Sequence, residues 1–180
     1  MPDQLQNAWD LGQTQPLPNL KEIQNIVISA MGDSAIAAEL VAASVFSNMH
    51  LPMTLHRSYG LPAFANSPRT LVICISHSGN TEETLDAFET AIKNGCSVFA
   101  ISTGGELEKR ASVKKNIMWK FQHKGMSNAG LAFPFGLLLA FFARMGFIPD
   151  PSEDVAEAIA MMRRSQQHAR ADVIAAKNPA

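Results

Sequence analysis

The chain has 180 residues, of which 47% are apolar and 17% charged, a composition typical of one globular domain with a sizeable core and not of a disordered chain. Fifteen basic against sixteen acidic side chains leave a formal net charge of −1. This balance argues against nucleic acid or an anionic membrane as a partner, because both attract an excess of positive charge. The low charged fraction predicts that another subunit or domain covers part of the surface.

The two cysteines indicate the compartment. Cys74 and Cys96 each lie inside an apolar run, as reduced, buried thiols do, and we therefore expect a cytoplasmic protein. Residues 1–20 lack the basic start and apolar centre of a secretory signal. The apolar stretch 129–143 is too short to span a bilayer and contains a proline and a glycine, so it predicts a buried helix and no contact with membrane.

Strands and helices are expected to alternate along the chain, after a short helix near the amino terminus. Continuous apolar runs predict buried strands, and apolar positions three and four residues apart predict helices. The expected order is a strand near 23–30, a helix at 34–46, a short strand at 53–57, a strand at 70–76, a helix at 81–94, a strand at 97–102, a short helix at 106–112 and a strand at 116–121. This alternation, repeated about four or five times, predicts an α/β fold in which a doubly wound parallel sheet lies between layers of helices.

The same patterns divide the chain into three parts. Residues 1–22 are expected to form an amino-terminal extension, residues 23–149 the α/β domain, and residues 150–180 a connector helix. Asp150, Pro151 and Glu153 have the spacing of an N-cap, a first-turn proline and a capping box, and the helix that they begin is expected to reach about residue 175.

Three loops rich in serine, threonine and glycine follow predicted strands, at residues 30–34, 76–81 and 102–105. In an open parallel sheet, ligands bind outside the carboxyl ends of the strands, where such loops lead into helices. Small hydroxyl groups and backbone N–H groups at the positive end of a helix can surround a phosphate group without help from lysine or arginine. The loops therefore predict a site for a phosphate ester.

Other phosphate and metal sites are not supported. The chain has no GxxxxGK[ST] sequence, and its first loop supplies one glycine, Gly32, where a dinucleotide fingerprint needs three. The two cysteines fall in different strands, and the five histidines show no ligand spacing. We expect no cofactor and no metal.

Residues 76–84, SHSGNTEET, look like the S-x-S-G-x-[ST] signature of the sugar isomerase (SIS) domain. Together with AMGDSAIAAEL at 30–40, they resemble the bifunctional phosphoglucose/phosphomannose isomerases, and the resemblance covers about residues 23–147. It implies a three-layer α/β fold whose doubly wound sheet of five parallel strands has the flavodoxin-like order and holds a sugar phosphate. It also implies phosphate contacts by Ser76, Ser78 and Thr81, and an approach to the substrate by Gly32, Asp33 and Ser34.

Three positions depart from the family's pattern. Asp33 replaces the second glycine of a GMGGS loop, and a carboxylate beside an anionic ligand is expected to weaken binding. Asn128 falls where the family has an arginine, which removes a cation that could stabilise an enediolate. His77 replaces the aromatic residue between the two loop serines.

The catalytic base cannot be matched to this sequence. In the family, a glutamate, a histidine and a late lysine come from a second SIS domain and from the partner subunit. The chain is therefore expected to be the amino-terminal half of a two-domain isomerase or a degenerate single-domain relative, and to be inactive alone. The leading hypothesis is a homodimeric isomerase that interconverts hexose 6-phosphates through a cis-enediolate. The alternatives are a SIS domain that senses a sugar phosphate without catalysis, and a flavodoxin-like domain for another phosphate ligand.

Several polar residues near the predicted site have simpler interpretations. Asn80 and Glu83 have the spacing of a capping box, and Glu82 and Glu83 in a first helical turn are expected to interact with the helix dipole. His77 is interpreted as an exposed loop residue, and His123 is expected on the rim of the site. Four phenylalanines are expected in the core or in an interface: Phe133, Phe135, Phe141 and Phe142.

Overall fold

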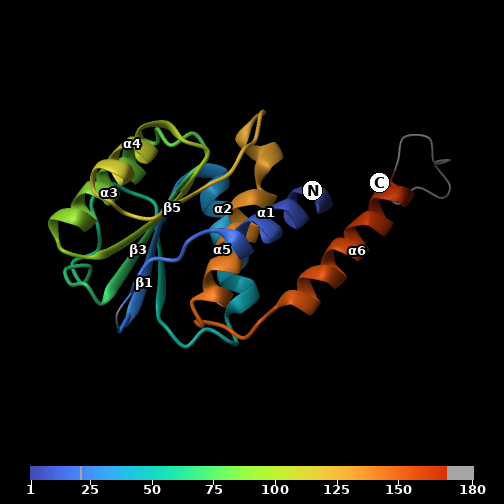
Figure 1. Ribbon diagram of the computed structural model, residues 1–180, viewed down its shortest axis with the longest axis horizontal. Coiled ribbons are helices and arrows are strands. Elements are labelled where there is room, and N and C mark those ends of the chain that lie inside the picture. Colours follow the sequence, from blue (N-terminus) through green and yellow to red (C-terminus); the bar gives the residue numbers. More distant parts are fainter. Residues whose placement is uncertain (21, 170–180) are drawn as a thin grey trace.

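The computed structural model describes residues 1–20 and 22–169 (Figure 1). Its strands are β1 (Asn25–Ala30), β2 (Met53–His56), β3 (Thr70–Ser76), β4 (Ser97–Ser102) and β5 (Met118–Lys120). Its helices are α1 (Pro2–Thr14), α2 (Gly32–Val45), α3 (Glu82–Lys93), α4 (Gly105–Val113), the 3₁₀ turn η1 (Ser127–Gly130), α5 (Ala132–Arg144) and α6 (Ser152–His168). The part of the connector helix expected beyond residue 169 lies outside the described residues.

The five strands form one parallel sheet in the order β2-β1-β3-β4-β5. Ala30 at the end of β1 is in register with Ile75 of β3, and Ser76 is in register with Ser102 of β4. The carboxyl ends of the central strands therefore meet at one edge of the sheet. The predicted fold class, including the flavodoxin-like strand order, is confirmed.

The sheet is covered on both faces. Because side chains alternate along a strand, Ile26 and Ile28 pack into one cluster with helices α1, α2 and α5, whereas Val27 packs into the other with α3 and α4. Figure 1 shows these two helical layers on opposite sides of the sheet. Helices α2 and α3, which follow neighbouring strands, thus lie on opposite faces.

Aromatic side chains fill the core beneath α5. The rings of Phe99 and Phe141 are stacked with their centroids 4.0 Å apart, and Trp119 meets Phe99 edge to face at 5.3 Å. The indole N–H of Trp119 donates to the carbonyl oxygen of Pro16 at 2.7 Å. Of the four phenylalanines expected in the core or an interface, Phe133, Phe141 and Phe142 are buried and Phe135 is partly buried.

Helix α1 lies directly against α5, so the expected amino-terminal extension contributes to the core. A Cβ atom on Gly12 would lie 2.6 Å from Cβ of Ala140, and one on Gly136 would lie 2.8 Å from Cβ of Ala8. The two glycines therefore allow the helix backbones to approach closely. Arg144 holds the end of α1 by donating to the carbonyl oxygens of Gly12 and Gln15 at 2.6 Å each.

Helix α6 projects from the body of the domain (Figure 1) and is attached mainly near its start. Val155 and Ile159 are buried, and Arg163 forms an ion pair of 3.0 Å with Asp3 of α1. The carboxylate of Asp150 accepts the N–H of Ser152 at 3.0 Å, although the N-cap position itself is one residue later than predicted. None of the described helices combines the length and apolar character needed to cross a bilayer.

Both cysteines are free and buried, as the sequence predicts. Complete burial raises the pKa of the Cys74 thiol to about 12, because a thiolate in the core would lose its hydration. Burial also raises the pKa of Cys96. Both side chains therefore act as small apolar core residues.

Candidate functional site

A crevice lies where the strand order reverses. From β1 the chain crosses through α2 to β2 on one side, and from β3 it crosses through α3 to β4 on the other. The loops after β1 and β3 therefore diverge, and ligands of such sheets bind at this switch point. A pocket of about 280 Å³ opens here, lined by Met31, Gly32, Asp33, Ser34, His77, Ser78 and Thr81.

Two helix N-termini meet at this pocket. The first residues of α2, Gly32 to Ser34, line it from one face of the sheet, and Thr81, the N-cap of α3, lines it from the other. The first turn of a helix has backbone N–H groups without intrahelical partners and a partial positive charge. The pocket therefore favours an anion, although none of its lining residues is a lysine or an arginine.

Five of the six residues that the sequence proposed for the site line this pocket, and the sixth does not. Ser76 is only 2% exposed and lies beneath the loop. Its hydroxyl oxygen accepts the N–H of Gly79 at 3.0 Å and shares a hydrogen bond of 2.9 Å with the hydroxyl of Thr81. Ser76 is thus placed to support Thr81 and the turn of residues 76–81, which we call the hydroxyl loop.

The loop after β4 supports the hydroxyl loop from the side. Thr103 donates to the carbonyl oxygen of His77 through its backbone N–H at 3.2 Å and its hydroxyl at 2.6 Å. The N–H of Leu107 donates to the carbonyl oxygen of Gly79 at 2.9 Å. Residues 102–105, expected as a third ligand loop, thus brace the hydroxyl loop and are absent from the pocket lining.

Asn80 does not form the capping box predicted for α3. Its side-chain oxygen instead accepts the backbone N–H of Glu106 at 3.0 Å, in the first turn of α4. The N-cap of α3 is Thr81, which makes no side-chain capping bond. The prediction was wrong because a neighbouring helix, 26 residues further along the chain, offers a donor to the same side chain.

His77 is not the exposed loop residue that the sequence predicts. It is partly buried, and its Nε2 lies 3.0 Å from Nδ1 of His123, which follows β5. Burial lowers the pKa of His77 below its usual value, the charge of His123 lowers it further, and the carboxylate of Asp33 opposes both effects. The only signal in the sequence was that both histidines follow strands of one parallel sheet.

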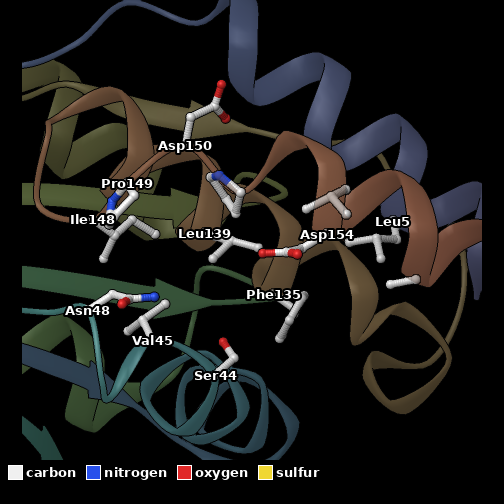
Figure 2. Close-up of a pocket in the computed structure, with 13 residues that line it drawn as sticks. Leu5, Ser44, Val45, Asn48, Phe135, Leu139, Ile148, Pro149, Asp150 and Asp154 are labelled. Carbon is white, nitrogen blue, oxygen red and sulfur yellow. The ribbon is translucent and has the colours of Figure 1, made fainter.

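A second cavity, of about 290 Å³, lies at the far end of α2 (Figure 2). Val45 and Asn48 line it from α2 and the turn that follows, and Phe135 and Leu139 line it from α5. The carboxylates of Asp150 and Asp154 also line it, and Asp150 already occupies an N–H group at the start of α6. An anion therefore suits the first pocket and not this one.

No protein-family model matches the chain. A bifunctional phosphoglucose/phosphomannose isomerase from Caldicellulosiruptor bescii is 32% identical over 180 residues, which are 99% of this chain and 52% of that protein. The chain is thus similar in sequence to about half of an isomerase of this name. An enzyme of the same name from Thermoplasma acidophilum is 45% identical over 87 residues, covering 47% of this chain and 26% of that protein. The chain thus spans about half the length of the first relative and matches a smaller share of the second.

Solved structures show that the fold is that of a sugar isomerase domain. Tagatose-6-phosphate ketose/aldose isomerase from Escherichia coli matches with a TM-score of 0.55 at 18% identity, over 90% of this chain and 46% of that chain. The sugar isomerase domain of the RpiR transcription factor from Sphaerobacter thermophilus matches with 0.55 at 19% identity, over 91% and 87%. The Vibrio vulnificus NanR protein complexed with ManNAc-6P matches with 0.54 at 14% identity, over 94% and 62%.

Among the residues that the structure describes, no group of three or more histidine, cysteine, aspartate or glutamate side chains could hold a metal ion. The chemistry available at the pocket is therefore that of hydroxyl groups, backbone amides, one histidine pair and the carboxylate of Asp33.

Proposed function

We propose that this chain is the sugar-phosphate-binding SIS domain of a phosphoglucose/phosphomannose isomerase and that it binds the phosphate group of a hexose 6-phosphate in the switch-point pocket. The observation that carries this proposal is the meeting of two helix N-termini with hydroxyl side chains at that pocket. Donors from both faces of the sheet can surround a phosphate dianion there.

The residues take different parts in this binding. Ser78 and Thr81 hold the phosphate oxygens through their hydroxyl groups, together with N–H groups of the first turn of α3. Ser76 acts through its hydrogen bond with Thr81 rather than by touching the ligand. Gly32, Asp33 and Ser34 lie on the side of the pocket formed by α2 and face the sugar.

The isomerase function is favoured over a sensor because the two relatives described above have the isomerase name. A sensor is the second candidate, since the fold also occurs in the NanR protein and in a transcription factor.

Aldose–ketose isomerisation needs a general base at C1 and C2 and an acid to open the ring. In this proposal those groups come from outside this chain, which binds hexose 6-phosphate as part of a cytoplasmic homodimer and does not isomerise it alone.

Calorimetric titration of the chain with fructose 6-phosphate, inorganic phosphate and unphosphorylated fructose tests the site. Both phosphate compounds should bind, and fructose should not.

Thr81→Val should weaken fructose 6-phosphate binding by about tenfold, because it removes one hydrogen bond to the anion. Thr14→Val, at the far end of α1, is the matched control. Absence of binding at millimolar fructose 6-phosphate by the folded chain would refute the proposal, and turnover in a coupled assay would refute inactivity of the chain alone.

Asp33→Asn is expected to strengthen fructose 6-phosphate binding by about fivefold, because it removes a negative charge from the pocket without changing the size of the side chain. The carboxylate lies in the first turn of α2 and lines the pocket. The difference in dissociation constant between the variant and the unaltered chain should become smaller as the salt concentration rises, because salt screens the repulsion. Asp154→Asn removes a carboxylate at the second cavity and should leave the affinity unchanged. Weaker binding by Asp33→Asn would indicate that the carboxylate accepts a hydrogen bond from the sugar.

A further inference from the structure

His77 and His123 form a hydrogen-bonded pair beside the anion pocket. His77 lines the pocket, and its Nε2 lies 3.0 Å from Nδ1 of His123. A ring N–H must donate to the lone pair of the other ring, so in the neutral pair one proton lies between the two nitrogens. That bond occupies Nε2 of His77 and leaves its Nδ1 for another partner.

The surroundings of His123 fix this geometry. A Cβ atom on Gly130 would lie 2.7 Å from Nδ1 of His123, so the absence of a side chain there makes room for the imidazole. Phe133 packs against the His123 ring with centroids 5.8 Å apart, and Phe121 meets the His77 ring edge to face at 5.7 Å. Both rings are therefore held by apolar contacts as well as by their mutual hydrogen bond.

Few charges face the pair. From α2, Asp33 favours protonation of His77, while His123 and burial oppose it. The neighbouring rings are uncharged: Phe121 follows β5, and Phe133 belongs to α5. Burial and the neighbouring imidazole thus disfavour a proton on His77 in the free chain, and a negative charge that enters the pocket would favour one.

We infer that this pair takes up one proton from solvent when a phosphate anion binds and that His77 then contacts the anion, with His123 as the positioning residue that fixes the His77 ring. The inference rests on the proposed function, because it requires an anion in the switch-point pocket. A bound dianion raises the proton affinity of His77, so by linkage the affinity for the anion rises as pH falls from about 8 to about 6.5. The ligand's own second ionisation, near pH 6, works in the opposite direction, so this gain must come from the protein.

Calorimetry with fructose 6-phosphate and inorganic phosphate, in two buffers of different ionisation enthalpy, measures both affinity and proton uptake. The chain should bind about fivefold tighter at about pH 6.5 than at about pH 8, which by linkage corresponds to a net uptake of about half a proton per ligand over this range. His77→Asn should lose the proton uptake and the tighter binding at low pH, and should keep only the opposite pH dependence that comes from the ligand's own ionisation. His50→Gln replaces an exposed histidine away from the pocket and is the matched control, which should keep both.

Nitrogen-15 spectra of the imidazole rings test the positioning role of His123. In the unaltered chain His77 should show one tautomer. His123→Phe keeps an aromatic ring but removes Nδ1, so His77 should become a mixture of tautomers and fructose 6-phosphate should bind about threefold to tenfold weaker. Gly130→Ala, which displaces the His123 ring while keeping every titratable group, should give the same mixture.

The outcomes separate this inference from the proposed function. Binding of fructose 6-phosphate without proton uptake, or two His77 tautomers in the unaltered chain, would overturn the role of the pair and leave the binding site intact. No binding of either phosphate compound at any pH by the folded chain would overturn both.

Discussion

Gly79→Ala is expected to weaken fructose 6-phosphate binding by about a hundredfold or more and to lower the free energy of unfolding by about 2–4 kcal/mol. Gly79 has a φ angle of +71°, and a Cβ atom there would overlap the carbonyl oxygen of Gly104. Because the obstacle is backbone, the hydroxyl loop and the loop after β4 would have to separate. Isothermal titration and urea unfolding measure the two effects.

Gly95→Ala is the matched control for this substitution. Gly95 has a φ angle of +70°, but a Cβ atom there would have no neighbour within 4 Å. It should therefore show only the cost of the left-handed conformation, about 1–2 kcal/mol, with unchanged binding. Equal effects of the two substitutions on binding would show that the contact with Gly104 does not hold the hydroxyl loop.

Gly12→Val is expected to destabilise the fold by about 2–4 kcal/mol without changing the residues that line the pocket. The new side chain would meet Cβ of Ala140 and the ring of Trp119, so α1 would have to move away from α5. Urea unfolding followed by tryptophan fluorescence measures the loss. The same enlargement at an exposed position of α6, Ala156→Val, should cost only a few tenths of a kcal/mol. An equally small effect at Gly12 would show that α1 is not part of the core.

Much of the fold could be predicted from the sequence because its strands are buried on both faces. The runs at 70–76 and 97–102 have the same bounds as β3 and β4, since continuous β-branched and apolar residues leave little choice of structure. The role of α1 was harder to predict. Helix propensity alone predicts that Gly12 destabilises α1. Its role in the close packing of α1 against α5 is evident only from its contact with Ala140.

The position of the site could also be predicted, whereas its internal contacts could not. The hydroxyl loop was identified from its composition and its place after a strand. The partners of Asn80 and His77 depend on β4 and β5 lying beside β3, and these contacts join residues 26 and 46 positions apart. Local spacing favours a nearby capping partner and contains no information on such long-range alternatives.

The bracing of the hydroxyl loop also affects how quickly and at what entropic cost a ligand is captured. The loop is held from within by Ser76 and from outside by Thr103 and Leu107, so its backbone is already fixed before any ligand arrives. Little conformational freedom remains to be lost on association, which leaves more of the contact energy available as affinity. Capture should then follow a single kinetic phase set by encounter and dehydration, as for a rigid receptor, without a slower induced-fit step.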